Sequence, residues 1–87
     1  MTIFAAVHND EVLAADEREH RLLLGMRFSH PGLDFEIWKL TVLDDAFARA
    51  LCLVSSVNDW RAAHDAFKNI MAAMSDGSAA LIQLERV

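Results

Sequence analysis

The chain has 87 residues, of which 54% are apolar, and a formal net charge of −5 from 13 acidic and 8 basic side chains. This length fits a single domain over residues 1–87, and too few lysines and arginines cluster to bind a nucleic-acid backbone directly. The apolar share exceeds the ~45–50% that is usual for globular domains, so we expect a second chain to cover part of the surface.

The first part of the chain is expected to form β-strands. Thr2–Val7 is apolar and ends at His8–Glu11, where asparagine and aspartate tolerate the positive φ of a tight hairpin turn. Val12–Ala15 then returns as a second strand, and Asp16–Glu19 is expected to be a charged loop. A helix over residues 10–24 is the alternative, but the apolar residues there form blocks instead of a stripe at helical spacing.

The next segment, His20–Phe28, alternates between faces as a third strand would, and Gly25 is expected to mark a β-bulge in it. Ser29–Gly32 is the clearest turn, because proline presets φ and glycine permits the positive φ of a type II turn. Leu33–Leu43 is the clearest strand, since it is rich in β-branched and aromatic residues.

Residues 46–54 are compatible with either a strand or a helix. Asp44 or Asp45 would cap a helix, and the residues that follow are good helix formers. The run Leu51–Val54, however, is apolar on all sides, which is typical of a strand buried on both faces. We favour a strand over Phe47–Ser55.

The C-terminal part predicts a helix over Asn58–Ser75, because it carries a continuous apolar stripe. The residues of this stripe are Trp60, Ala63, Phe67, Ile70, Met71 and Met74. Asp76 and Gly77 end the helix, and Ala79–Val87 alternates as a closing strand. The expected fold is therefore α+β: a mostly antiparallel sheet in β-meander order, with one long C-terminal helix packed on one face and a closing C-terminal strand.

A sequence pattern in the second half carries a family resemblance. A run of small and apolar residues leads into a helix that starts with tryptophan, in the sequence ALCLVSSVNDWRAAHDAFKNIMAAM, which includes the helix segment Phe67–Met71. With the strand before it, the stretch Leu33–Met74 resembles the DcrB/PsbP/Mog1-like domains. The resemblance implies an adaptor-like or chaperone-like role, as in dimeric chaperones of type VI secretion effectors. It implies no catalytic residue, since the motif consists of packing residues.

No group of residues predicts catalysis, a cofactor or a metal. The four histidines lack the i, i+4 pairing of helical metal sites; they are His8, His20, His30 and His64. Cys52 is the only cysteine, so it forms no internal disulfide. It lies in an apolar run and is expected to be buried, which argues against a Cys52–His64 nucleophile pair. Asp44 and Asp45 are more simply a solvated turn than an acid–base pair. We expect a protein that is not an enzyme.

Strand Leu33–Leu43 carries the functional prediction. Trp38, Leu40 and Val42 lie on one face of it and other apolar residues on the opposite face, while one helix is available as cover. Tryptophan is a favoured interface anchor. We therefore predict a protein-binding surface of Trp38, Leu40 and Val42 with the neighbouring Glu36, in an adaptor or chaperone module that forms a homodimer.

The acidic charge leaves a second function open. A small inhibitor or immunity-like protein, of the phage or mobile-element type, would use its carboxylates to block a basic surface on a partner. An enzyme subunit with a site shared between chains is a third alternative. Salt dependence separates the first two, because screening weakens charge mimicry more than apolar contact. No segment reaches the ~20 apolar residues of a membrane span and residues 1–8 lack a basic signal-peptide start, so we expect a cytoplasmic protein without membrane contact.

Overall fold

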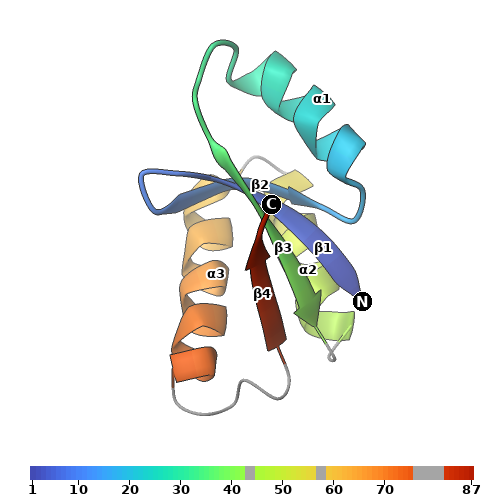
Figure 1. The fold of residues 1–87 in the computed structure, drawn as a ribbon, viewed down its shortest axis with the longest axis vertical. Coiled ribbons are helices and arrows are strands. Elements are labelled where there is room, and N and C mark those ends of the chain that lie inside the picture. The colour runs from blue at the N-terminus through green and yellow to red at the C-terminus, as the bar shows by residue number, and fades with distance from the viewer. Residues whose placement is uncertain (43–44, 57–58, 76–81) are drawn as a thin grey trace.

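Four strands and three helices make up the described part of the chain (Figure 1). The structure, a computed structural model, describes residues 1–42, 45–56, 59–75 and 82–87. In chain order the elements are β1 (Thr2–His8), β2 (Glu11–Asp16), α1 (Glu19–Ser29), β3 (Glu36–Val42), α2 (Asp45–Ser56), α3 (Trp60–Ser75) and β4 (Ile82–Arg86). None of the helices in these described ranges is long and apolar enough to cross a membrane.

The strands form one antiparallel sheet in the order β2-β1-β3-β4. Strand β1 is central, because it pairs with β2 on one side and with β3 on the other, where Ala5 lies opposite Trp38. Strand β4 pairs with the outer side of β3, with Leu84 opposite Leu40. The α+β class and the antiparallel sheet are therefore confirmed. The expected β-meander is wrong, since β3 returns beside β1 instead of beside β2.

The tight turns follow the local chemistry that the sequence predicts. Asn9 and Asp10 have φ angles of 49° and 63°, in the left-handed region that asparagine and aspartate enter more readily than most residues. Gly32 has a φ of 77° in the connection between α1 and β3. The hairpin turn at His8–Glu11 is thus confirmed. The turn at Pro31 and Gly32 is present one residue later than predicted, over His30–Leu33, because Ser29 still belongs to α1 and the backbone N–H of Leu33 donates to the carbonyl oxygen of His30.

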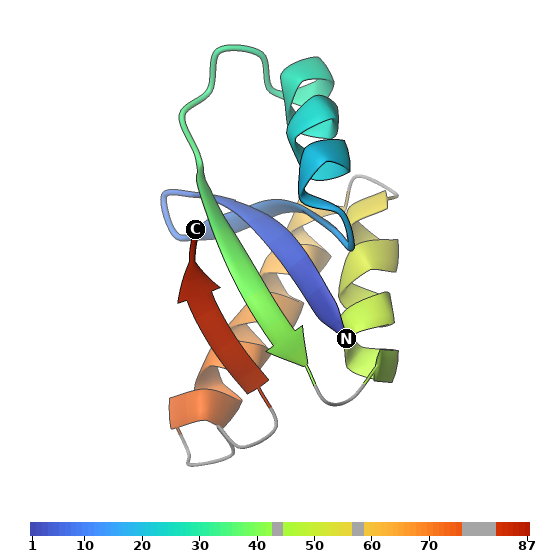
Figure 2. The ribbon, with the colours of Figure 1, turned by 45° about the vertical axis from the view of Figure 1, so that its right-hand side comes forward.

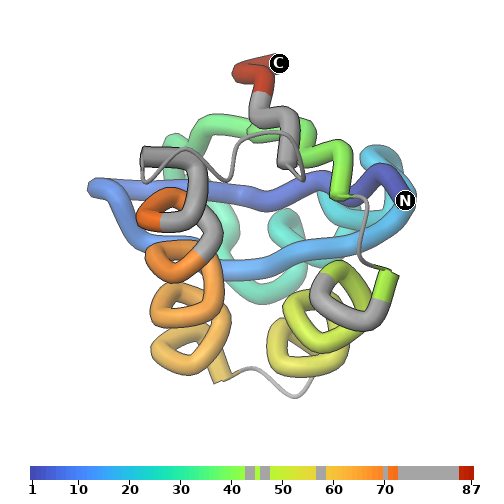
Figure 3. Tube along the Cα trace, turned by 90° about the horizontal axis from the view of Figure 1, so that it is seen from below, coloured from blue at the N-terminus to red at the C-terminus, as the bar shows by residue number. Residues whose placement is uncertain are grey.

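The larger core lies between the sheet and the helix pair α2 and α3, which lie on the same side of it (Figure 3). Alternate residues of β1, such as Ile3 and Ala5, point into this core. Its buried members are Ile3, Ala5, Val7, Val12, Ala15, Leu40, Val42, Ala48, Leu51, Ala63 and Phe67. These residues come from β1, β2, β3, α2 and α3, so this core holds the domain together.

A smaller core lies on the opposite face of the sheet, under α1 (Figure 2). Helix α1 packs against β1 and β2 there. Leu22 and Met26 of the helix bury against Ala6 of the central strand. Both faces of the sheet therefore carry helices, and the expected arrangement of one long C-terminal helix on one face is wrong.

Residues 19–29 form a helix, so the strand predicted over His20–Phe28 is wrong. Leu22 and Met26 are spaced both as alternate strand residues and as i, i+4 helix residues, and the helix buries them both. Gly25 lies inside this helix, so the predicted bulge is also wrong. The alternative helix over residues 10–24 is wrong for residues 11–16, which form β2, whereas residues 19–24 of that range do lie in a helix, α1.

The start of α1 is fastened by Asp16 at the end of β2. Its carboxylate accepts hydrogen bonds from the backbone N–H of Arg18, at 3.0 Å, and from Nε of Arg21, at 2.8 and 3.0 Å. Burial acts to raise the pKa of Asp16, but the hydrogen bonds from Arg21 and Arg18 outweigh it and hold the pKa below its ordinary value. The segment Asp16–Glu19, predicted to be a loop, thus joins the strand directly to the helix.

Residues 45–56 form helix α2, so the strand favoured for Phe47–Ser55 is wrong. The buried residues of α2 follow helical spacing, since Ala48, Leu51 and Ser55 point inward while Leu53 is exposed. The buried hydroxyl of Ser55 donates a hydrogen bond to the carbonyl oxygen of Leu51, which satisfies it within the helix.

Helix α3 lies within the range predicted for it and shares its face of the sheet with α2. Asp59 caps it by accepting a hydrogen bond from the backbone N–H of Ala62, at 3.1 Å. Ala63 and Phe67 of the predicted stripe are buried, whereas Met71 is partly exposed.

The closing strand is confirmed only over Ile82–Arg86. The predictions that lie outside the described residues or side chains concern Leu43, Asp44, Asn58, Ile70, Met74, Asp76, Gly77 and residues 79–81.

Candidate protein-binding site

The structure divides the four predicted contact residues between core and surface. Leu40 and Val42 are 0% and 1% exposed, because α2 and α3 cover their face of the sheet. Trp38 lies on the same face but nearer the end of the sheet, and it is only partly buried. Glu36 is exposed at the start of β3. The chain's own helices therefore supply the cover that we expected from a second chain, and only Trp38 and Glu36 reach the surface.

A cavity of about 280 Å³ opens where Trp38 reaches the surface, between β3 and α3. Its lining combines apolar side chains with charged ones; the residues are Val7, Asp10, Glu36, Trp38, Phe67, Lys68 and Met71. We call it the Trp38 pocket. Because an aromatic and aliphatic floor lies next to two carboxylates and one ammonium group, the pocket suits a side chain that is apolar along its length and charged at its tip.

Glu36 fixes the indole of Trp38 at the edge of this pocket. One carboxylate oxygen, Oε2, accepts a hydrogen bond from the indole Nε1 at 3.3 Å. The other, Oε1, accepts one from the guanidinium of Arg86, which lies opposite Trp38 in the β3–β4 pairing. Since Glu36 uses both oxygens, it links the tryptophan ring to the last described strand and restricts the rotation of that ring.

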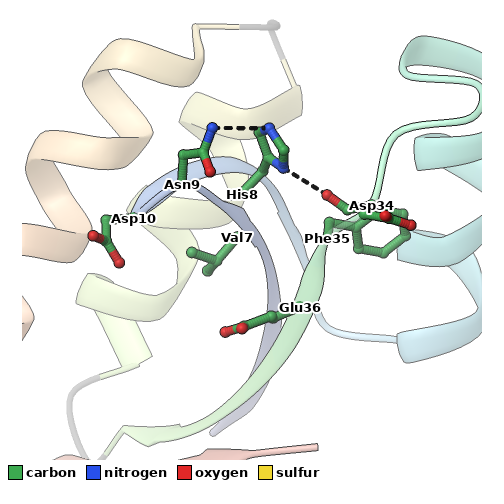
Figure 4. A pocket seen from close by; sticks show the side chains of 7 residues that line it. All are labelled: Val7, His8, Asn9, Asp10, Asp34, Phe35 and Glu36. Carbon is green, nitrogen blue, oxygen red and sulfur yellow. Dashed lines mark hydrogen bonds between the residues drawn. The ribbon is translucent and has the colours of Figure 1, made fainter.

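A second depression of about 480 Å³ adjoins the Trp38 pocket (Figure 4). It shares Val7, Asp10 and Glu36 with that pocket; the remaining lining residues are His8, Asn9, Asp34 and Phe35. Three carboxylates and no lysine or arginine line it. The two hollows together therefore form one surface with an apolar end at Trp38 and an acidic end at the β1–β2 turn, which favours positively charged ligands.

His8 holds the acidic end in place. Its Nδ1 lies 2.6 Å from the carbonyl oxygen of Asp34, and its Nε2 lies 3.2 Å from the side-chain amide nitrogen of Asn9. A carbonyl oxygen can only accept, so Nδ1 carries the proton, and Nε2 accepts from the amide. The ring ties the β1–β2 turn to the segment before β3, as the dashed lines in Figure 4 show.

The other candidate chemical groups lie apart from this surface. His20 is exposed, and His30 contacts the hydroxyl of Ser29 at 2.9 Å. His64 has a buried Nδ1 without a hydrogen-bond partner in the described part of the structure. Among the described residues no group of three or more histidine, cysteine, aspartate or glutamate side chains is placed to hold a metal ion. Asp45 lies 3.3 Å from the N-terminal ammonium of Met1.

Cys52 lines a groove between α1 and α2 that does not include His64. It is half-buried, and burial, with smaller contributions from Asp16 and Glu17, raises the pKa of its thiol to about 11. A thiol with so high a pKa is mostly protonated at neutral pH and is a poor nucleophile.

We expect alkylation of Cys52 by iodoacetamide to be slow in the folded chain. Raising the thiol pKa from 9.0 to about 11 lowers the thiolate fraction at pH 8 about a hundredfold. The alkylation rate, followed by mass spectrometry, should rise steeply between pH 8 and about 11. The same chain unfolded in urea is the control and should react at the rate of an ordinary thiol. Equal rates in the two states would contradict this prediction.

No family model, curated protein or solved structure matches this chain. The resemblance of residues 33–74 to the DcrB/PsbP/Mog1-like pattern therefore stays a prediction. The candidate site is therefore defined by the geometry of the structure alone. The structure also adds residues to the site that the sequence did not indicate. Phe67 and Met71 are predicted as core residues and Asp10 as a turn residue, yet all three meet at the Trp38 pocket.

Proposed function

We propose that this chain is a protein-binding module of the adaptor type, and that it takes a basic side chain with apolar neighbours from a partner protein. The observation that carries the proposal is the Trp38 pocket, where an indole held by Glu36 lies beside Phe67, Met71 and Asp10. The acidic depression next to it extends the same surface.

Lysine and arginine match this surface because each has a long aliphatic stem and a cationic tip. The stem packs on apolar side chains such as Phe67 and Met71. The cation is attracted both by the face of an indole and by carboxylates. A net charge of −5 also speeds the approach of a basic partner. Tryptophan at the centre of such a site contributes a large share of the binding energy.

An incoming guanidinium competes with Arg86, which already bonds to Glu36. Binding therefore exchanges an intramolecular ion pair at the surface for an intermolecular one. Exposed ion pairs contribute little to stability, so this exchange costs little. The carboxylates of Asp10 and Asp34 on the acidic end add attraction that Arg86 does not supply.

The test is a selection of peptides that bind the immobilised chain, from a displayed random library. We expect enrichment of lysine or arginine next to apolar residues. Affinity for a selected peptide, measured by fluorescence anisotropy, should fall at least tenfold for Trp38→Ala, since hot-spot tryptophans contribute about 2 kcal/mol or more. Trp60→Ala is the matched control, because Trp60 does not line the pocket.

Two outcomes would count against the proposal. Selected peptides without basic residues, or peptides that bind the Trp38→Ala variant with full affinity, would place the contact surface elsewhere. The acidic-inhibitor alternative, which the net charge of −5 supports, predicts binding that ignores Trp38 and disappears as salt rises. The proposed adaptor function predicts that part of the affinity persists at high salt, because salt does not screen the apolar contacts.

A further inference from the structure

Helix α1 is apolar on two sides, but the chain covers only one of them. Leu22 and Met26 point into the small core, whereas Leu24 is 50% exposed and Phe28 is 87% exposed. Figures 1 and 2 show α1 at one end of the molecule, beyond the end of α2 and away from α3. A helix that is apolar on more than one side is normally covered on each of them.

The uncovered side has the spacing of a helix–helix contact. Arg21, Leu24, Gly25 and Phe28 follow the i, i+3, i+4, i+7 pattern, and all four are exposed. Arg21 and Gly25 of this set also help to line the groove between α1 and α2, a cavity of about 490 Å³. Leu53 of α2, the other large exposed apolar residue nearby, lines the opposite wall of the same groove.

No feature within the described chain requires glycine at position 25. It lies inside a helix, where glycine is less favourable than alanine. It has no positive φ, and a Cβ atom built on it would meet nothing within 4 Å. Close approach of a second helix at this position would explain the glycine, because a residue without a side chain leaves room for the other helix.

We propose that a second copy of this chain occupies this side of α1, in an antiparallel two-fold pairing that places Phe28 of each copy on Gly25 and Arg21 of the other, at the mouth of the groove. Charge favours this partner and this direction. The segment Asp16–Arg21 carries three carboxylates and two guanidinium groups, a net −1, and the rest of the helix carries Arg27, a net +1. Antiparallel pairing brings opposite signs together and opposes the two helix dipoles.

The pairing is self-complementary, which is the requirement for a closed two-fold dimer. A guanidinium over a phenylalanine ring is a favourable cation–π contact, and Arg21 is positioned for it by its bonds to Asp16. An α1 of 11 residues is about 16 Å long, so the interface is small and the dimer is weak, of the class formed by transient complexes.

Sedimentation equilibrium tests this proposal. Between about 1 μM and 1 mM, a range that reaches weak dissociation constants, the apparent mass should rise from 9.7 kDa towards twice that value. Phe28→Glu should remain monomeric at every concentration. Val87→Glu, which places the same charge on another exposed apolar residue outside α1, should dimerise like the original chain. A mass of 9.7 kDa for the original chain over the whole range would overturn the proposal.

Gly25→Ala separates the dimer contact from helix stability. Alanine strengthens the isolated helix, so the Tm of the monomer, measured at low concentration, should rise. The added methyl group blocks the close approach, so the dissociation constant should rise at least tenfold. A variant with a higher Tm and unchanged or tighter association would contradict the pairing. The inference is independent of the Trp38 pocket, and the Phe28→Glu monomer is expected to keep its affinity for the selected peptides.

Discussion

Phe67→Ala is expected to lower the free energy of unfolding by about 3–5 kcal/mol, the range for truncating a buried aromatic side chain. Phe67 is 7% exposed and lies in the larger core, where α3 meets the sheet. A domain of this size has a total stability of about 5 kcal/mol, so the variant should be largely unfolded near room temperature. Urea unfolding followed by circular dichroism measures the difference.

Phe28→Ala is the matched control, since it makes the same chemical change at an exposed position. At low protein concentration, it should change the free energy of unfolding by no more than about 0.5 kcal/mol. Similar losses for the two variants would mean that α3 does not present Phe67 to the core.

Leu51→Ala is expected to cost about 2–5 kcal/mol, because it leaves a cavity in the larger core. Leu53→Ala, two residues further along α2, should change the stability by no more than about 0.5 kcal/mol. Leu51 is 0% exposed and Leu53 is 67% exposed. The same unfolding experiment gives both values.

This pair of substitutions distinguishes a helix from a strand. Residues i and i+2 lie on the same face of a strand but on different sides of a helix. If residues 45–56 formed a strand, Leu51 and Leu53 would be buried together and their substitutions would cost similar amounts. Unequal costs therefore support α2, and equal large costs would contradict it.

Local chemistry could be predicted from the sequence where one or two residues decide the backbone. Asn9, Asp10 and Gly32 have positive φ angles, and the turns they form lie within one residue of where we expect them. The range of α3 is predicted well because its apolar stripe fits no other regular period. In these places the information lies within a few neighbouring residues.

Helices α1 and α2 could not be predicted because their apolar residues fit two periods. Leu22 and Met26 repeat at a spacing of four, which suits a strand face and a helix face equally. In α2 the run from Leu51 to Val54 contains no polar residue that would indicate which side is exposed. Leu53 lies on the exposed side. Packing against a sheet formed by distant residues decides both cases, and a window of neighbouring residues does not contain that information.

The site was predictable only in part for the same reason. Trp38 stands out as an anchor from its residue type, and Glu36 from its position beside it. The burial of Leu40 and Val42 depends on α2, which the sequence did not reveal as a helix. The meeting of Asp10, Trp38 and Phe67 at one pocket joins three elements that are far apart along the chain.

The central place of β1 has a consequence for how the chain folds. Strand β1 pairs on its second side with β3, whose paired residues lie about 30 to 40 positions later in the sequence, as in the pair formed by Ala5 and Trp38. The β1–β2 hairpin and α1 are local and need no such closure, so we expect them to form early. We expect the slow step of folding to be the closing of the long loop that brings β3 back to β1. Until that step, one edge of β1 stays unpaired, and crowded newly made chains are most exposed to pairing with each other there.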